Sequence, residues 1–276
     1  MLSEGLKTDF IHTVLGKTGI RVHRLGLSAS YRPGRKTIYR SIDEGLNYFF
    51  CYGFDGQMTA VLRDVLRHDR EKFIVSTGAY NLLIGYTNLR RTLEKRLRQL
   101  KTDYIDVFLF LGVMKGKEFP EKAREEMIRF REEGKVRAIG MSSHDRNFAG
   151  QMAREGALDV MMIRYNAAHR GAEQDIFPHV SAHQTGIVGY TATRWSYLLR
   201  RPPKNWPKDD PLPTAGQCYR FVLSNPNVHV CLTAPSNEKQ FLENIRSVAA
   251  GPLSEDEMVF MRKFGDSVHH TKKWFM

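Results

Sequence analysis

The sequence predicts an α/β protein: a single-domain (β/α)₈ barrel that begins with a short β-hairpin. Eight apolar runs of strand length alternate with amphipathic helical patterns from one end of the 276-residue chain to the other. The runs are continuous rather than alternating, which is typical of parallel strands covered by helices. Eight βα pairs with short joints indicate a closed barrel, and barrels of this length form one domain, here residues 1–276.

The elements follow in regular order. The predicted strands are residues 24–29, 46–51, 73–78, 104–111, 136–142, 159–165, 186–191 and 229–233. The predicted helices are residues 36–44, 57–68, 88–100, 121–133, 146–155, 172–183, 214–224 and 238–249. Ahead of them, a glycine-containing turn between apolar ends in VLGKTGIRVHRLG (14–26) predicts a hairpin that closes the barrel floor.

Local signals support several of these boundaries. Thr214 with Gln217, and Ser254 with Glu257, have capping-box spacing and are expected to open helices. The proline-rich stretch 200–213 is expected to be a loop after the seventh strand.

Composition excludes several classes of protein. No apolar run approaches the roughly 20 residues that cross a bilayer, and the N-terminus lacks a signal-peptide pattern, so we expect a cytoplasmic protein without a membrane partner. Three widely spaced cysteines, Cys51, Cys218 and Cys231, argue against a disulfide framework and a structural zinc site.

The chain is basic, with 42 Lys and Arg against 30 Asp and Glu, a formal charge of +12. The densest basic run, LRRTLEKRLRQLK (89–101), has its leucines at helical spacing and is interpreted as the solvated face of an outer helix. No aromatic residues that could stack on bases interrupt it, so we expect no nucleic-acid partner.

Chemistry in this fold belongs at the C-terminal ends of the strands. The titratable or phenolic candidates there are Tyr31, Tyr52, Asp55, Tyr80, His144 and His169, and they form no local metal-binding motif. Arg164 follows Met162 by two on the sixth strand, so the two share a face. An inward arginine needs either a carboxylate, such as Asp55 or Asp145, or an anionic ligand.

Seven segments, in order, carry a family resemblance. LGKTGIRVHRLGLS (15–28), DEGLNYF (43–49), LKTDYIDVFLF (100–110), EEGKVRAIGMSSH (132–144), RYN (164–166), SNEKQFLEN (236–244) and GPLSEDE (251–257) resemble the aldo-keto reductase family. The resemblance implies a (β/α)₈ barrel that binds NADPH across the strand ends and reduces aldehydes or ketones.

The residues at the positions of that family's Asp–Tyr–Lys–His tetrad are different in this chain. The four positions hold Phe50, Asp55, Gly78 and Leu111. In the family, the tyrosine hydroxyl protonates the carbonyl oxygen as hydride arrives, which phenylalanine, glycine and leucine cannot do. The resemblance therefore implies an oxidoreductase with a rebuilt site, in which Tyr52, Asp55, Tyr80 or His144 supplies the acid and Arg164 anchors the substrate.

The family's cofactor positions are partly retained. The resemblance implies that NADP(H) or NAD(H) contacts Ser142, Ser143, Tyr190, Thr191, Ser236, Asn237, Gln240, Glu243 and Asn244. Ser142 and Ser143 correspond to the Ser–Asn pair at the nicotinamide amide, Tyr190 to the stacking aromatic residue, and Glu243 and Asn244 to the adenine contacts. Gln240 replaces the arginine that grips the 2′-phosphate.

Three functions stay open at this point: the rebuilt oxidoreductase, which we favour, a non-redox lyase or isomerase in the same pocket, and a catalytically inactive binding subunit. The expected partner is a small molecule. Arg32, Arg164, Arg194 and Lys239 are interpreted as contacts for an anionic cofactor or substrate. The sequence does not decide between NADP and NAD, nor the oligomeric state.

Overall fold

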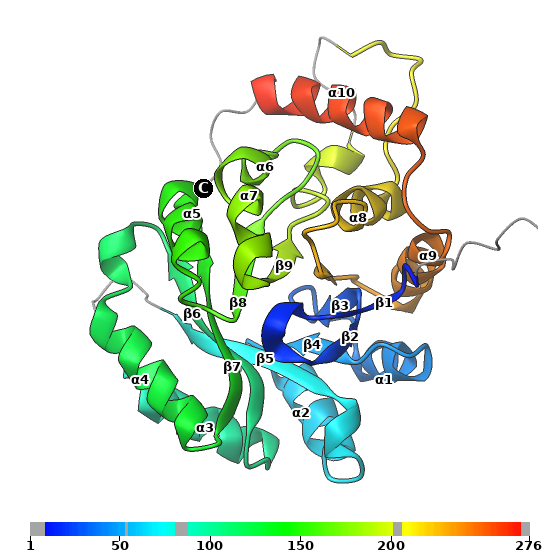
Figure 1. Ribbon diagram of the computed structural model, residues 1–276. Helices are drawn as coiled ribbons and strands as arrows, with labels where there is room; N and C mark the ends of the chain where they lie inside the picture. Colours follow the sequence, from blue (N-terminus) through cyan, green and yellow to red (C-terminus); the bar gives the residue numbers. More distant parts are fainter. Residues whose placement is uncertain (1–8, 53–54, 81–87, 201–205, 272–276) are drawn as a thin grey trace, which may run out of the picture.

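Eight parallel strands close into a barrel, in the order β10-β3-β4-β5-β6-β7-β8-β9 (Figure 1). The structure, a computed structural model, describes residues 9–52, 55–80, 88–200 and 206–271, apart from the side chains of the last two. The barrel strands are β3 (Leu25–Ser28), β4 (Tyr48–Phe50), β5 (Ile74–Tyr80), β6 (Ile105–Val113), β7 (Val136–Ser143), β8 (Val160–Arg164), β9 (Gly186–Tyr190) and β10 (Val230–Thr233). All eight predicted strands and the (β/α)₈ fold class are confirmed.

Helices surround the barrel (Figure 1). They are α1 (Arg35–Asp43), α2 (Gly56–Val65), α3 (Leu89–Leu100), α4 (Glu121–Glu132), α5 (Arg146–Glu155), α6 (Ala172–Asp175), α7 (Phe177–Val180), α8 (Ala215–Leu223), α9 (Glu238–Ala249) and α10 (Glu255–Thr271). The prediction of one continuous helix over residues 172–183 was wrong. It breaks at Ile176, whose φ of −122° is not helical, and restarts with Pro178 in the first turn of α7, where a missing N–H costs nothing.

The predicted N-terminal hairpin is confirmed as β1 (His12–Val14) and β2 (Arg21–His23), paired antiparallel. Its apolar side chains Leu15, Ile20 and Val22 are buried in one cluster with residues of the barrel interior. The hairpin therefore extends the barrel core at the end where the strands begin.

The barrel carries two apolar layers, which explains the continuous strand runs. One layer fills the interior and includes Tyr48, Phe50, Leu109 and Val188. The other lies between the strands and the surrounding helices. A strand buried on both faces has no polar alternation to display.

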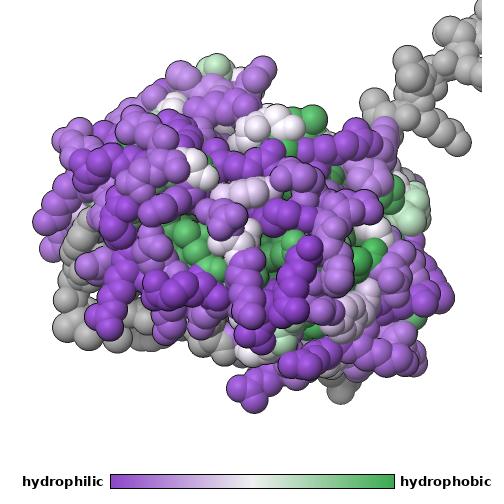
Figure 2. Space-filling model, turned by 90° about the horizontal axis from the view of Figure 1, so that it is seen from below, coloured by the Kyte–Doolittle hydropathy of each residue, from purple (hydrophilic) through white to green (hydrophobic). Residues whose placement is uncertain are grey.

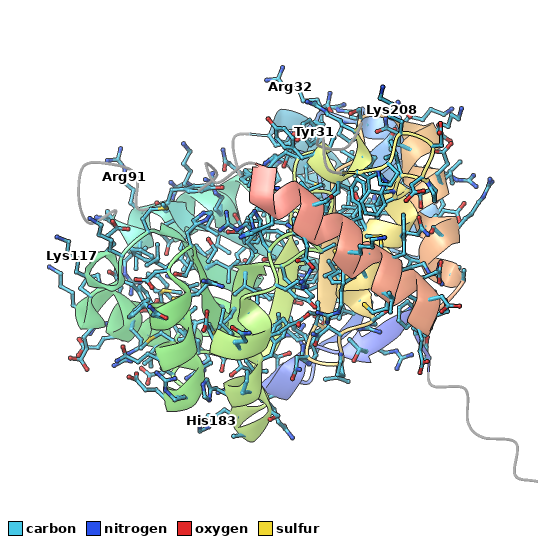
Figure 3. All side chains as sticks on the ribbon, turned by 90° about the horizontal axis from the view of Figure 1, so that it is seen from above. Tyr31, Arg32, Arg91, Lys117, His183 and Lys208 are labelled. Carbon is cyan, nitrogen blue, oxygen red and sulfur yellow. The ribbon has the colours of Figure 1, made fainter. Side chains whose placement is uncertain are left out.

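The basic run that the sequence places on an outer helix forms α3. Leu89, Leu93, Leu97 and Leu100 are buried, and Arg91 projects outward (Figure 3). Arg90 pairs with Glu133, and Glu94 pairs with Lys135, both across to the neighbouring α4–β7 segment. Two charged residues of α3 are therefore paired with the neighbouring segment.

The C-terminal helix α10 completes the fold and lies near α6 and α8 (Figure 1). It begins at the predicted capping box: the Ser254 backbone N–H donates to Glu257, and the Glu257 N–H donates to the Ser254 hydroxyl. Arg220 of α8 holds it in place through both carboxylate oxygens of Glu257, at 2.8 and 3.0 Å.

The face shown in Figure 2 is mostly hydrophilic, with separate small hydrophobic areas. Within the described residues, every helix is too short or too polar to cross a membrane.

Candidate functional site

Two of the four positions that the resemblance assigns to tetrad residues lie inside the barrel. Phe50 on β4 and Leu111 on β6 are 1% and 2% exposed. Both belong to the interior apolar cluster, together with Met162 of β8. Met162 therefore faces the interior, and the two-residue spacing places Arg164 on the same face of β8.

The third position, Gly78 of β5, leaves no room for a side chain. An ideal Cβ there would lie 2.0 Å from the backbone oxygen of Leu109 on β6. The obstacle is backbone, so it cannot move aside as a flexible side chain would. Any residue larger than glycine therefore requires the two strands to separate.

The fourth position, Asp55, caps a helix. Its Oδ1 atom accepts hydrogen bonds from the backbone N–H groups of Gln57 and Met58, at 3.1 and 3.3 Å, at the start of α2. Asp is among the preferred N-cap residues, because its carboxylate satisfies N–H groups that lack helical partners. Its Oδ2 atom is buried without a hydrogen-bond partner among the described residues.

Three tyrosines, Tyr52, Tyr80 and Tyr190, pack on the interior cluster at the strand ends. Tyr52 follows Phe50 by two residues, and their rings meet edge to face with centroids 4.7 Å apart. The Tyr52 ring lies nearly parallel to that of Tyr80, at 6.3 Å. Burial raises the pKa of both Tyr80 and Tyr190. Phenolic groups thus surround the end of the apolar interior.

A chain of hydroxyl groups leads to Tyr52. The Ser28 and Ser30 hydroxyls are 2.8 Å apart, and the Ser30 hydroxyl donates to the Tyr52 oxygen at 3.2 Å. Because Ser30 is exposed, this chain connects the phenol with solvent.

The predicted catalytic residues are divided between two cavities. Tyr52 and Asp55 line a cavity of about 580 Å³ between the ends of β3 and β4, with Arg32 and Arg35 at its edge. Figure 3 shows Arg32 beside Tyr31 at the margin of the molecule. His144 and Arg164 line a second cavity of about 520 Å³ beside β7 and β8. The four side chains therefore do not form one catalytic group.

The second cavity, which we call the basic cleft, is lined by Ser143, His144, Arg146, Ile163, Arg164, Ala168, His169, Arg170, Gly171, Ile176, Asp266 and His269. His144 links it to the barrel mouth, since both of its ring nitrogens lie 3.4 Å from the Tyr190 hydroxyl. Burial, followed by the charge of Arg164, lowers the pKa of His144. Burial likewise lowers the pKa of Arg164.

Sequence reasoning missed four charged or titratable residues of this cleft: Arg146, Arg170, Asp266 and His269. Arg146 lies only a few residues after the end of the fifth barrel strand, so a search that extended slightly further past the strand ends would have included it. Asp266 and His269 come from α10, outside the eight βα pairs, and no sequence signal connects them with β8.

The loop after β9 is strained. Thr191, Arg194, Trp195 and Ser196 all have positive φ angles, between 49° and 66°, a region that residues other than glycine adopt only at a cost. Asn166 holds the loop by donating from Nδ2 to the Thr191 carbonyl oxygen at 2.9 Å. The Thr191 hydroxyl is buried and has no hydrogen-bond partner among the described residues.

This loop lines a groove between β3, β9 and β10, with a volume of about 110 Å³. Its other contributors include Ser30, Tyr52 and Leu232. The groove therefore continues to the Tyr52 cavity, with which it shares two residues. A strained loop with an unsatisfied hydroxyl at its start suits a ligand that accepts hydrogen bonds, such as a phosphate.

Several predicted cofactor residues have partners within the protein. The Ser142 hydroxyl accepts from the Gly112 N–H at 2.9 Å, and the Ser143 hydroxyl donates to the Val113 carbonyl oxygen at 3.2 Å. Asn244 is buried and donates to the Thr233 hydroxyl at 3.1 Å. These contacts position the residues, and their role toward a cofactor stays a prediction.

The α9 residues behave as helix-start residues. Asn237 accepts from the Gln240 N–H, and the Gln240 side chain accepts from the Ser236 N–H. Ser236, Asn237, Gln240 and Glu243 are all exposed. Their side chains therefore lie at the surface, where they can meet a ligand.

No group of three or more His, Cys, Asp or Glu side chains within the described ranges is arranged to hold a metal ion.

Comparison with known proteins finds one family. Residues 36–214 match the family described as "Aldo/keto reductase family". The uncharacterized oxidoreductase YrpG of Bacillus subtilis is 26% identical over 65% of this chain and 65% of its own length, just under two thirds. The aldo-keto reductase AKR11C1 from Bacillus halodurans, in its holo form, superposes with a TM-score of 0.77 at 21% identity, over 92% of this chain and 95% of its own. An aldo/keto reductase from Klebsiella pneumoniae, solved in complex with NADP and acetate, superposes with a TM-score of 0.71 at 20% identity, over 92% and 95%.

Proposed function

Because this chain belongs to the aldo/keto reductase family, we propose that it is an oxidoreductase that binds NADP(H) or NAD(H) and works without the family's tetrad. The substrate in this proposal is a small carbonyl compound. The NADP bound to the Klebsiella pneumoniae relative supports the choice of cofactor.

The observation that carries the proposal is the strained loop after β9. Its first residue, Thr191, presents a buried hydroxyl without a partner among the described residues, directly after Tyr190. A diphosphate group would satisfy that hydroxyl, and Tyr190 would pack against the nicotinamide ring. Ser236 and Asn237, at the exposed start of α9, and the exposed Glu243 further along the helix would contact the adenosine end.

We infer that Tyr52 is the proton donor. Tyr52 follows Phe50, the last residue of β4, by two residues, and its ring packs on the apolar interior. When bound, the cofactor would supply the hydride that reduces the carbonyl carbon. The Tyr52 hydroxyl would donate its proton to the carbonyl oxygen, and the Ser28–Ser30 hydroxyl chain would return a proton from solvent. Asp55 would serve as the cap that holds the start of α2 beside it.

One observation favours a second candidate, the catalytically inactive barrel. Phe50, Leu111 and Met162 are all at most 6% exposed and fill the interior with apolar atoms. A protein of this kind would bind cofactor and turn over no carbonyl substrate.

Calorimetric titration with NADPH and with NADH tests cofactor binding. We expect binding of at least one, weakened about tenfold in Thr191→Val, which keeps the shape and removes the hydroxyl. The matched control is Thr185→Val, because the Thr185 hydroxyl is also buried and unpartnered among the described residues but stands ahead of the first residue of β9, at the opposite end of the strand. No heat of binding from either cofactor at millimolar concentration would exclude the proposal.

A further inference from the structure

We propose that the basic cleft holds the carboxylate or phosphate group of the substrate, with Arg146, Arg164 and His169 as its contacts. This inference rests on the proposed function and gives its substrate a class: an oxo acid or a phosphorylated aldehyde or ketone.

The first argument is the charge of the cleft. Its lining contains three arginines and three histidines but one carboxylate, Asp266. That carboxylate accepts from Arg170 at 2.7 Å, and Arg170 also donates to the backbone oxygens of Ala167 and Arg262. Arg170 is therefore engaged in holding α10 against the β8 loop. Arg146 and Arg164 bring two further positive charges to the lining, and Arg146 also pairs with Asp175, which is not among the lining residues.

The second argument is the way Arg146 is seated. An ideal Cβ on Gly171 would stand 1.1 Å from an Nη atom of Arg146, so the guanidinium lies directly on the glycine backbone. Its closest carboxylate oxygen, on Asp175, is 3.4 Å away, longer than a good charge-assisted hydrogen bond. Arg146 and Gly171 both line the cleft, and a guanidinium with one long ion pair can bind a second anion.

The third argument is His169. Its Nε2 atom is buried and has no hydrogen-bond partner among the described residues, although it lines the cleft. A buried polar atom without a partner favours a ligand that supplies one. Burial, followed by the charges of Arg164 and Arg194, lowers the pKa of His169 to about 3. An anion in the cleft would oppose these charges and raise that pKa.

The fourth argument is position. His144 lines the cleft and also lies 3.4 Å from the Tyr190 hydroxyl at the barrel mouth. A molecule whose anionic group sits in the cleft can therefore extend past His144 toward Tyr190. A volume of about 520 Å³ suits a small metabolite rather than a macromolecular segment.

The test uses inorganic phosphate and malonate as separate probes, added to the full chain without cofactor. The readout is the imidazole NMR signals of His144 and His169, assigned with single His→Gln variants. We expect at least one probe to shift both signals and to raise the pKa of His169. The probe that binds more tightly decides between a phosphorylated substrate and an oxo acid.

Three variants locate the site. Arg146→Gln and Arg164→Gln should each weaken probe binding about tenfold. Arg154→Gln removes the same charge from the same helix, α5, outside the cleft, and should leave binding unchanged. If neither probe shifts His144 and His169, or if Arg154→Gln weakens binding as much as the cleft variants, the inference is wrong.

These outcomes are independent of the cofactor titration. If the cofactor binds and neither probe does, only the inference that the substrate carries an anionic group is wrong. Probe binding without cofactor binding would overturn the oxidoreductase proposal and leave the anion site.

Discussion

Gly78 of β5 lies so close to Leu109 of β6 that a Cβ atom at position 78 would stand 2.0 Å from the Leu109 carbonyl oxygen. The two residues are direct partners in the parallel ladder. Gly78 occupies the position that the family resemblance assigns to the tetrad lysine. This contact leaves no space for a lysine, or for any other side chain, at position 78 unless the two strands separate.

Gly78→Lys should therefore fail to restore a family-like site. We expect Gly78→Ala to lower the free energy of unfolding by about 2–3 kcal/mol, because the new methyl group forces the β5 and β6 backbones apart. Urea denaturation measures this. Gly56→Ala is the control, since a Cβ there meets nothing within 4 Å, and it should change stability little. A Gly78→Lys protein as stable as the parent would contradict the steric argument.

Tyr52→Phe should separate binding from chemistry. Loss of the hydroxyl is expected to reduce the turnover number for a carbonyl substrate about 10²-fold or more, while NADPH affinity stays the same. Steady-state kinetics and calorimetry measure the two quantities. Tyr39→Phe, which removes a hydroxyl bonded to Asp64 on the outer helices, is the control. Equal turnover in Tyr52→Phe and the parent would assign the proton to another group.

Stability should fall as the pH drops from 7 to 4. The pKa of His23 is lowered to about 4, mainly by burial and secondly by the charge of His12. The pKa of His229 is also lowered to about 4, mainly by burial and secondly by the charge of Arg24. Between pH 6.5 and 4 the unfolded chain thus binds more protons than the folded one, so unfolding is favoured as the pH falls.

The effect is at most about 3 kcal/mol for each histidine. His23→Asn offers a direct test, because an amide oxygen can replace the Nδ1 atom that accepts from the Leu25 N–H at 3.0 Å. The variant should show a smaller dependence of unfolding free energy on pH, whatever its stability at pH 7. An unchanged slope would show that His23 does not titrate in this range.

Glu257→Gln should loosen α10. Glu257 accepts from Arg220 through both oxygens, and a neutral amide can keep one of these hydrogen bonds. We expect faster amide hydrogen exchange in α10 and a loss of about 1–2 kcal/mol in its local stability, with the exchange of β5 and β6 unchanged. Glu255→Gln, at the exposed start of the same helix, serves as the comparison. Because α10 supplies Asp266 and His269 to the basic cleft, probe binding should weaken in Glu257→Gln as well.

Much of the fold was predictable, because the signals involved are local. The runs around Phe49 and Phe108 are buried on both faces, and the leucines of α3 repeat at helical spacing. The capping boxes at Thr214 and Ser254 also formed as their spacing indicated. The break at Ile176 was missed because the apolar spacing continues through it, while the backbone does not.

The candidate site was predictable only as a set of residue types. The strand-end rule found Tyr52, Asp55, His144 and Arg164, but it could not tell that they line two separate cavities. Nor did it predict that Asp55 would cap α2, since the same carboxylate pattern suits an acid and a cap equally well.

Sequence alone thus established the barrel, its hairpin and its family resemblance, because hydrophobic period and short motifs are properties of neighbouring residues. The tertiary structure decided which positions still accept a side chain and which polar atoms lack a partner. The lack of space for a side chain at Gly78 is due to Leu109 on the next strand. The basic cleft is lined by residues as far apart in the sequence as Arg146 of α5 and His269 of α10. Contacts between segments so far apart are set by how the helices and strands pack, and no local pattern encodes them.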